Sequence, residues 1–491
     1  MKTTAELLLA IDLGTTVLKA GVIDRRSGRV VAVAAQRLAV RAQADGTREQ
    51  KLSDLDRGFD RVLAQLHIQL GRQWQNVVGV GLASQGGSFA ICNRRTGAAR
   101  TPLRLWSDQR AGRLVPQVAA LRPVAYWQKL ALNNGPGWGL ARMLWLREQN
   151  PKLLAVENIY VGAGEYANFQ LTGEWRQDAG NALQIGCYRV PKRVLDAGPL
   201  ALVDVPLSFV APLRDGRLPL AAAAARRWQL PVGIPVAGPY FDHEAGYLGA
   251  VEVSDRPLQC SLGTAWVGNF SLPANAQVKP GNQLVVPAPH HDGWLVVQPL
   301  LTGNVTWDWA LDTFIGGPHP AALRQAAKLF KKQLVPPAGM VALPWMHMLN
   351  PLQRDAIGAG GFFGGGVMAQ RADFVRAVAL GMTCELARVF RKVRDQRQAD
   401  SVVLSGGASK GAVFQSYLAA LFAPLPVLVL PDEDMAGLRG CLHEFRPHAA
   451  AGRAQRVTVP AAAEKIRAGF AVYDELFERV LGCEGILPLD F

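Results

Sequence analysis

Two short glycine–threonine turns, about half a chain apart, constrain the fold more than any other feature of this sequence. The first, Gly14-Thr15-Thr16, joins apolar runs at residues 8–13 and 17–23. The second, Gly263-Thr264, lies between two similar runs. Each pattern predicts a β-hairpin whose tip exposes backbone N–H groups and hydroxyls, which are the donors that phosphate oxygens need. Because each turn lies between two apolar strand patterns, the pair predicts a duplicated fold that holds a nucleotide between its halves.

The rest of the chain alternates strand and helix patterns. Residues 52–70 carry a helical spacing of apolar side chains, and residues 76–83 form a strand pattern. Near the C-terminus, a helical pattern at 371–393 precedes a strand pattern at 401–404 and a second helix at 413–421. This alternation predicts the α/β class. No GxxxxGKS or GxxxxGKT stretch occurs, which excludes a P-loop.

The chain is long enough for two or three domains, with 491 residues of which 49% are hydrophobic and 19% charged. Its net charge of +14 fits either a nucleic-acid-binding protein or an arginine-rich protein with a cleft for anionic phosphates. The basic residues are scattered, and no RNP, zinc-finger or basic-zipper signature occurs. We therefore expect the phosphate cleft and no nucleic-acid partner.

The six cysteines form no CxxC pair, and most lie in apolar surroundings, so we expect free thiols in a reducing compartment. The N-terminus lacks the basic-then-apolar pattern of a signal peptide. No apolar stretch approaches the length that spans a bilayer. The expected location is the cytoplasm, and no membrane partner is expected.

Two aspartates are candidates for chemistry. Asp12 lies in an apolar strand pattern, where burial of a carboxylate is costly, so a functional role explains it better than packing does. Such a carboxylate can hold Mg²⁺ through water. Asp242 follows Gly238-Pro239 where a helical pattern begins, and it can be a helix N-cap, a general base or both.

Taken in order, the motifs of this chain resemble those of the FGGY family of carbohydrate kinases, and the xylulose kinase branch most. The resemblance is collinear from about residue 8 to residue 480. It is carried by a first phosphate motif, a sugar-binding stretch, two further family blocks, the segment with the catalytic aspartate, a second phosphate motif and an adenosine motif. These blocks are residues 11–19, then 81–85 with 105–111, then 142–146, then 171–174 with 178–182, then 239–249, then Gly263-Thr264, and finally 406–409.

The resemblance implies two actin-like, ribonuclease-H-like domains around a nucleotide- and sugar-binding cleft. It assigns residues 1–241 to an N-terminal domain on the sugar side and residues 242–491 to a C-terminal domain on the ATP side. Members of the family transfer the γ-phosphoryl group of ATP, with Mg²⁺ as cofactor, to a hydroxyl of a sugar or polyol. The expected partners are ATP and a small-molecule sugar or polyol, and a homodimer is left open.

The resemblance also implies a role for each matching residue. Asp242 is the expected catalytic base and, with Asp12, a metal ligand. The acceptor is expected to contact Gln85, Gly86, Gly87, Trp106, Asp108 and Asp242. ATP is expected to contact Gly14, Thr15, Thr16, Lys19, Gly263, Thr264, Gly303, Gly406, Gly407, Ala408 and Lys410.

The sequence departs from the family pattern at several positions. Gly86-Gly87 stands where pentulose kinases usually carry Met-His or a similar pair and glycerol kinases carry Arg-Glu, so we expect lost bulk and a lost hydrogen-bonding group there. Leu380 stands where a glutamate is common, and Arg439 interrupts a run of small residues. The expected acceptor is a ketopentose such as xylulose. Glycerol or another polyol, and a non-catalytic sugar- or nucleotide-binding relative, remain alternatives.

Overall fold

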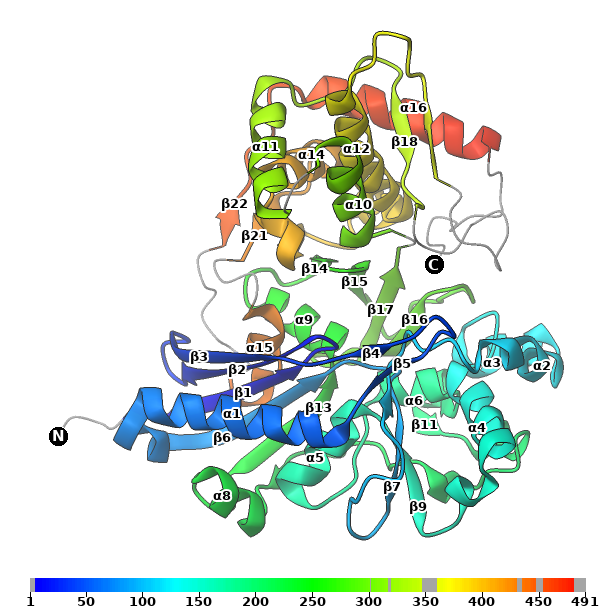
Figure 1. The fold of residues 1–491 in the computed structure, drawn as a ribbon. Helices are drawn as coiled ribbons and strands as arrows, with labels where there is room; N and C mark the ends of the chain where they lie inside the picture. The colour runs from blue at the N-terminus through cyan, green and yellow to red at the C-terminus, as the bar shows by residue number, and fades with distance from the viewer. Residues whose placement is uncertain are drawn as a thin grey trace. The chain divides into compact units, whose positions relative to one another are not determined.

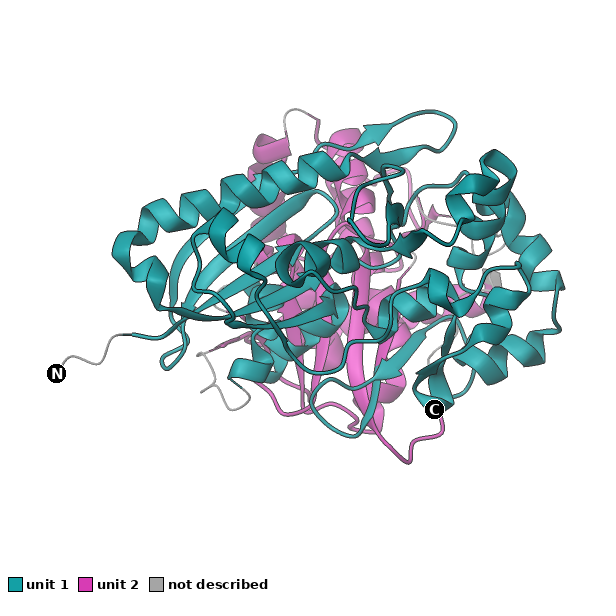
Figure 2. Cartoon of the chain, turned by 90° about the horizontal axis from the view of Figure 1, so that it is seen from below, with its two compact units in different colours: residues 1–252, 279–295, 435–450 teal, residues 253–278, 296–434, 451–491 magenta. Residues whose placement is uncertain are grey.

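The computed structural model describes residues 5–300, 302–316, 319–346, 360–430, 435–446 and 454–480. The chain divides into two compact units, coloured teal and magenta in Figure 2. Unit 1 comprises residues 1–252, 279–295 and 435–450, and unit 2 comprises residues 253–278, 296–434 and 451–491. The compact units are not continuous stretches of chain, so they do not test the expected domain boundary after residue 241, which stays a prediction.

Unit 1 is built on a mixed sheet with the strand order β12-β13-β6-β1-β2-β3. β1 and β2 form the first predicted hairpin, with antiparallel pairing from Leu7 opposite Asp24 to Leu13 opposite Leu18. β6 runs parallel to both β1 and β13. The six strands are β1 (Leu7–Leu13), β2 (Val17–Asp24), β3 (Val30–Arg37), β6 (Val77–Ser84), β12 (Leu218–Pro219) and β13 (Pro235–Phe241).

Side chains of β1 alternate between two hydrophobic clusters, because successive residues of a strand point to opposite faces. Leu9 and Ile11 belong to the cluster that includes α1 (Leu52–Leu70). Leu8 and Ala10 belong to the cluster that includes α9 (Asp242–Val251) and Leu438. The helix predicted at 52–70 is therefore confirmed, and it covers one face of the sheet (Figure 1).

On the other face, α9 packs against the short helix α15 (Ala436–Gly440), although nearly two hundred residues of chain separate them. Small residues make this close approach possible. A Cβ atom on Gly249 would overlap the carbonyl of Ala436, and one on Gly440 would overlap that of Ala245. The two backbones therefore touch where larger side chains would hold them apart.

Unit 2 contains a sheet in which β17, β15, β14, β20, β21 and β22 are neighbours in that order. β14 and β15 form the second predicted hairpin, with antiparallel pairing, and β20 runs parallel to β14. These strands are β14 (Pro257–Leu262), β15 (Trp266–Pro273), β17 (Gly293–Pro299), β20 (Ser401–Ser405), β21 (Val427–Val429) and β22 (Gln455–Arg456).

The helices of unit 2 are α10 (Asn304–Phe314), α11 (His319–Lys332), α12 (Arg371–Val389), α13 (Arg391–Asp395), α14 (Ala412–Phe422) and α16 (Ala463–Val480) (Figure 1). The single helix expected over 371–393 is therefore two helices. The break falls at Phe390, whose φ of -97° and ψ of 20° leave the helical region. The strand predicted at 401–404 and the helix at 413–421 are confirmed.

The remaining elements are short. The helices are α2 (Val115–Ala120), α3 (Val124–Ala131), α4 (Trp138–Gln149), α5 (Ala163–Thr172), α6 (Ala179–Ile185), α7 (Ala197–Ala201) and α8 (Ala222–Trp228). The strands are β4 (Arg41–Ala42), β5 (Arg48–Gln50), β7 (Ala90–Asn93), β8 (Leu103–Arg104), β9 (Asn158–Val161), β10 (Tyr188–Arg189), β11 (Val194–Leu195), β16 (Leu284–Pro287), β18 (Val341–Leu343) and β19 (Gly361–Phe363). Among the described residues, no helix is both long and apolar enough to cross a membrane.

Candidate active site

Three adjacent parallel strands of unit 1 end at one edge of the sheet, and each delivers a predicted site residue there. Asp12 pairs with Ala83 across β1 and β6, and Phe241 pairs with Ser84 across β13 and β6. Because the carboxyl ends of parallel strands meet at one edge, Asp12, Gln85 and Asp242 lie close to one another. The topology therefore gathers residues that the chain separates by more than two hundred positions.

Asp242 is the first residue of α9, and Phe241 is the N-cap, so the alternative that Asp242 is the helix N-cap is wrong. Its carboxylate accepts a hydrogen bond from the backbone N–H of His243 at 2.9 Å. Its side chain keeps 39% of its surface accessible. The partial loss of water raises the pKa of Asp242 to about 7. A carboxyl group with such a pKa, open on one side, can accept a proton near neutral pH.

Burial and the negative charge of Asp242 raise the pKa of Asp12 to about 6, although the positive charge of Lys19 opposes the shift. Lys19 stands opposite Asp12 in the β1–β2 hairpin. Two neighbouring carboxylates suit a hard divalent cation, which prefers oxygen ligands. Within the described part of the chain, no group of three His, Cys, Asp or Glu residues is placed to hold a metal. Two carboxylates plus water and substrate oxygens are a donor set that Mg²⁺ accepts.

Gly437 of α15 is a site residue that the sequence motifs missed. A Cβ atom there would lie 2.8 Å from Oδ2 of Asp12, so a side chain would displace the carboxylate. Arg439, two residues on, donates a hydrogen bond to the carbonyl of Gly28 at 3.0 Å and pairs with Glu252 at 3.6 Å. The arginine that departs from the family pattern at position 439 therefore contacts the turn between β2 and β3.

The first glycine–threonine turn is joined to the predicted sugar-binding stretch by hydrogen bonds between side chains. The Thr15 hydroxyl donates to Oε1 of Gln85 at 3.0 Å and accepts from the indole N–H of Trp106 at 3.2 Å. The Ser88 hydroxyl also donates to Oε1 of Gln85, at 2.8 Å, and accepts from the backbone N–H of Trp106. Since both hydroxyls donate to the same atom, they fix the orientation of the Gln85 amide.

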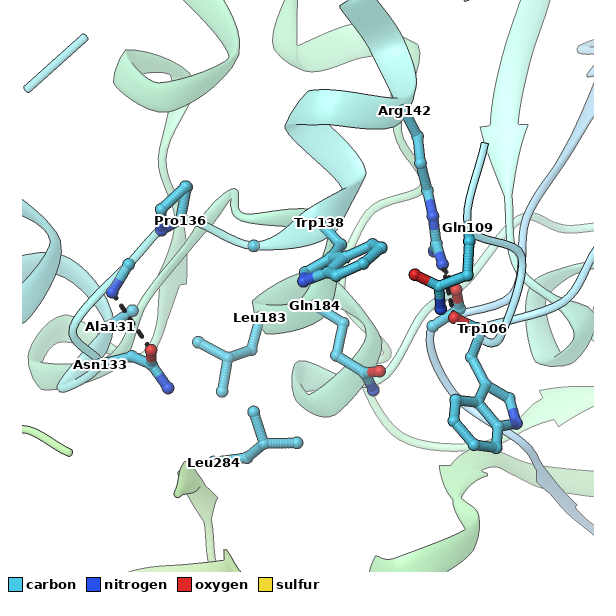
Figure 3. A pocket seen from close by; sticks show the side chains of 13 residues that line it. Trp106, Gln109, Ala131, Asn133, Pro136, Trp138, Arg142, Leu183, Gln184 and Leu284 are labelled. Atoms are coloured by element: carbon cyan, nitrogen blue, oxygen red, sulfur yellow. Dashed lines mark hydrogen bonds between the residues drawn. The ribbon is translucent and has the colours of Figure 1, made fainter. Parts of the chain in front are cut away.

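A pocket of about 400 Å³ opens beside this network in unit 1 (Figure 3). Two indoles, three amide side chains and the Arg142 guanidinium are among the groups that line it. The lining residues are Gly87, Trp106, Gln109, Ala131, Asn133, Gly135, Pro136, Gly137, Trp138, Arg142, Leu183, Gln184 and Leu284. Aromatic faces with neutral amides are a surface that suits a polyhydroxylated molecule.

Two side chains hold the 85–88 loop at this pocket. Arg142 donates hydrogen bonds to the carbonyls of Gly87 and Trp106, the second at 3.0 Å. Asn181 accepts from the backbone N–H of Gly87 at 3.2 Å and donates to Glu165 at 2.6 Å. The arginine of the predicted 142–146 block is therefore a positioning residue for this loop.

The extra space expected at Gly86-Gly87 is not what the structure shows. A Cβ atom on Gly86 would lie 2.5 Å from Nε2 of Gln184 and 2.5 Å from the ring of Phe241. A Cβ atom on Gly87 would overlap Oε1 of Gln184. Side chains from α6 and from the end of β13 therefore fill the volume that the two glycines leave.

Asp108 lies outside the lining of this pocket. Its buried carboxylate accepts hydrogen bonds from the backbone N–H of Arg48 at 2.9 Å and from the guanidinium of Arg110 at 2.6 Å. Arg110 also binds Glu49. The predicted contact of Asp108 with the acceptor gains no support from this geometry, since an ion pair already occupies the carboxylate.

The second glycine–threonine turn, in unit 2, is held by backbone contacts. Gly406, with φ +86°, lies so close that a Cβ atom would be 2.9 Å from the carbonyl carbon of Leu262. A Cβ atom on Gly303 would overlap the carbonyl of Thr264. Asn304 donates its backbone N–H to the carbonyl of Gly263 at 3.1 Å. The predicted residues Gly263, Thr264, Gly303 and Gly406 are therefore neighbours.

A second pocket, of about 630 Å³, adjoins the predicted adenosine motif in unit 2. Gly407, Ala408 and Lys410 of that motif line it, together with residues of α10, α11 and α14 that sequence reasoning missed. The missed residues include Trp307, Leu323, Phe330 and Phe414, and Leu334, just after α11, also lines the pocket. Their apolar, aromatic character suits a flat heterocycle.

Known proteins match both parts of the chain. The model of the N-terminal domain of the FGGY family of carbohydrate kinases matches residues 7–249, and that of the C-terminal domain matches residues 258–442. The xylulose kinase of Bacillus subtilis is 21% identical over 424 residues, which are 84% of this chain and 83% of the relative. The L-fuculokinase of Escherichia coli is 22% identical over 467 residues, or 87% of this chain and 90% of the relative.

A solved xylulose kinase from Rhodospirillum rubrum superposes with a TM-score of 0.83 at 21% identity, covering 97% of this chain and 99% of that one. The predicted α/β class with a two-domain actin-like fold is thereby confirmed. The family matches, the relatives and the fold agree with the order of motifs along the sequence. The chain belongs to the FGGY family of carbohydrate kinases and is a sugar phosphotransferase.

Proposed function

We propose that this enzyme transfers the γ-phosphoryl group of ATP, with Mg²⁺, to a hydroxyl of a neutral ketopentose such as xylulose. The observation that carries the proposal is the placement of Asp12 and Asp242 at one sheet edge, beside a pocket lined by indoles and amides. Phosphoryl transfer requires positioning and charge neutralisation more than covalent chemistry, and this arrangement supplies groups for both.

Asp242 is the proposed base, because its raised pKa and partial exposure allow it to take the proton from the attacking hydroxyl. Asp12 and Asp242 would hold Mg²⁺, which neutralises the charge of the phosphate oxygens when bound. Lys19, opposite Asp12, adds positive charge at the same turn. The turn residues Gly14, Thr15 and Thr16 offer backbone N–H groups to phosphate.

In unit 2, we place the purine in the pocket between α10, α11 and α14, with Gly407, Ala408 and Lys410 at its wall. Gly263, Thr264, Gly303 and Gly406 would then border the phosphates, because they surround the second turn. Close backbone contacts at Gly303 and Gly406 leave the N–H groups of this turn rigidly presented.

The pocket of unit 1 favours a neutral acceptor over a sugar acid. Among the described residues that line it, Arg142 alone carries a permanent charge, and its guanidinium is bound to the carbonyls of Gly87 and Trp106. The amides of Gln109, Asn133 and Gln184 both donate and accept hydrogen bonds, as hydroxyl groups require. The xylulose kinases among the relatives support a ketopentose.

The test is ADP release by the wild type across a panel of ketoses, alditols, aldoses and aldonates. The variant Asp242→Asn should bind ATP and acceptor nearly as the wild type does but lose about 10²-fold or more in kcat, the scale of general base catalysis. Asp215→Asn, which removes an exposed carboxylate of the same unit, is the matched control and should keep full turnover.

The outcomes separate the alternatives. A preference for glycerol would reassign the acceptor to a polyol, and turnover of aldonates would contradict the neutral pocket. Binding of ATP and sugar without ADP release would identify a non-catalytic relative. Near-normal turnover of Asp242→Asn at saturating acceptor would overturn the assignment of the base.

A further inference from the structure

Gln184 lies where the missing side chains of the 86–87 loop would be. It comes from α6, which belongs to a different part of the chain from the loop. Its Nε2 atom would be 2.5 Å from a Cβ atom on Gly86, and its Oε1 atom would overlap one on Gly87. In Figure 3 its amide projects into the pocket that Trp106, Trp138 and Arg142 also line.

The Gln184 amide has hydrogen-bonding capacity to spare. In the described residues its side chain makes one hydrogen bond, from Nε2 to the carbonyl of Gly180 at 3.4 Å. An amide carries two donors and an acceptor with two lone pairs, so most of this capacity is unused. The side chain is partly exposed to the pocket. A ligand in the pocket is therefore the natural partner for the amide.

The backbone of α6, which carries Gln184, is held in place by hydrogen bonds. Asp178 caps α6 by accepting the backbone N–H of Asn181 at 2.8 Å. Asn181, three residues before Gln184, accepts the backbone N–H of Gly87 at 3.2 Å. The helix and the glycine loop are therefore tied directly to each other. A polar group presented on such a fixed frame discriminates between ligands better than a mobile one.

We propose that Gln184 replaces the absent loop side chains and is the specificity-determining residue that hydrogen-bonds the hydroxyls of the acceptor; this rests on the proposed sugar kinase function. The arrangement transfers recognition from the loop to α6. A side chain at position 86 or 87 would overlap Gln184 in its present position. The two glycines therefore make the space that the glutamine occupies.

The first experiment compares Gln184→Leu, which keeps the size but removes the amide, with wild type across the acceptor panel. We expect kcat/KM for the preferred acceptor to fall about ten- to a hundredfold, because a lost hydrogen bond leaves an acceptor hydroxyl unpaired. The ranking of acceptors should change, and the KM for ATP should not. A uniform loss across all acceptors, or an unchanged ranking, would overturn the proposal.

Gln69→Leu is the matched control. Gln69 also lies on a helix of unit 1 and also makes one 3.4 Å side-chain hydrogen bond to a backbone carbonyl, that of Val33, but it is exposed and outside the pocket. Its variant should keep the wild-type ranking.

The second experiment needs no acceptor. Gly87→Ala is introduced into the wild type and into Gln184→Ala, and the Tm of each protein is measured. The strain of a side chain at φ +71° is the same in both backgrounds and cancels, so the cycle reports the overlap with Gln184 alone. We expect a smaller loss of Tm in the Gln184→Ala background. Equal losses would overturn the shared-space argument.

These experiments also distinguish this proposal from the proposed function. If wild type phosphorylates no acceptor, the kinase assignment to a ketopentose fails, and the Tm cycle is still informative. Sugar titration followed by tryptophan fluorescence, which Trp106 and Trp138 in the pocket wall make possible, then compares wild type with Gln184→Leu directly. If wild type and Gln184→Leu bound each neutral sugar with the same affinity, the proposed role of Gln184 would be overturned.

Discussion

The two glycine–threonine turns look alike in sequence, but the structure supports them in different ways. The first turn is braced by side chains, because Thr15 links it to Gln85 and Trp106. The second turn is braced by backbone, because Gly303 and Gly406 lie directly against it. The position that holds Asp12 in the first hairpin holds Ser261 in the second. A duplicated turn can thus be supported in two ways, and under the proposed function the first copy would serve charge and acceptor and the second rigid contact with a nucleotide.

The largest difference between the turns should appear at Asp12 and Ser261. Asp12→Asn removes the proposed metal carboxylate while keeping its size, and we expect kcat to fall about 10²- to 10³-fold, as for other losses of transition-state charge stabilisation. Ser261→Ala is the control at the equivalent position and should change kcat less than tenfold. Titration of Mg²⁺ against activity provides the second readout, and comparable losses in both variants would remove the distinction between the turns.

Gly303→Ala tests the backbone support of the second turn. The new methyl group would overlap the carbonyl of Thr264, and overpacking of this kind costs about 1–3 kcal/mol. We expect the KM for ATP to rise roughly ten- to a hundredfold, with little change for the acceptor.

Gly14→Ala is the counterpart in the first turn. Its Cβ atom would lie 3.0 Å from the carbonyl of Val17, so a shift of a few tenths of an ångström can relieve the contact. A larger effect on ATP from Gly14→Ala than from Gly303→Ala would reverse the proposed difference in support.

Thr15→Val breaks the side-chain bracing of the first turn without changing its shape. It leaves Oε1 of Gln85 with one hydrogen bond fewer and the Trp106 indole N–H without its acceptor, at a cost of about 1–2 kcal/mol. We expect the acceptor KM to rise about tenfold and the ATP KM to change less. Thr264→Val makes the same replacement in the second turn, and it should leave the acceptor KM unchanged.

The smallest effect concerns pH, because the loop network of the first turn ends at a buried carboxyl group. Burial, together with the negative charge of Asp178, raises the pKa of Glu165 to about 8. The folded state therefore holds a proton that the unfolded state releases above about pH 4.5, so stability falls as pH rises from there through about 8.

The neutral variant Glu165→Gln should remove this dependence. Its Tm relative to wild type should increase between pH 5 and 9, by roughly 2–4 °C for each kcal/mol gained. In unit 2 the buried Glu385 is paired with Arg388, and Glu385→Gln serves as the comparison that should destabilise at every pH. A constant difference in Tm between Glu165→Gln and wild type would contradict the raised pKa.

Local pattern was enough to predict the two hairpins and the helices at 52–70 and 413–421. Period-two alternation and turn glycines report on neighbours along the chain, which is why β1, β2, β14 and β15 could be located. The alternative of Asp242 as a helix N-cap missed by one residue, since helix ends depend on backbone angles that neighbouring strands impose.

Tertiary contacts set the limit of sequence reasoning. Gln184 filling the place of Gly86, Gly437 approaching Asp12, and the aromatic wall from α10, α11 and α14 all join segments that are distant in the chain. A glycine in a sequence indicates that space is free beside the backbone, but the tertiary fold determines which other side chain fills that space.

The three-segment make-up of unit 1 bears on how the protein is synthesised. α15, which places Gly437 against Asp12, is encoded almost two hundred residues after α9. During translation the N-terminal 252 residues emerge long before α15 is made. The β1–β6 edge therefore lacks this helix while unit 2 is synthesised. A chain that ends before residue 435 therefore lacks the helix that lies against Asp12, and this edge of the sheet reaches its final form only near the end of synthesis.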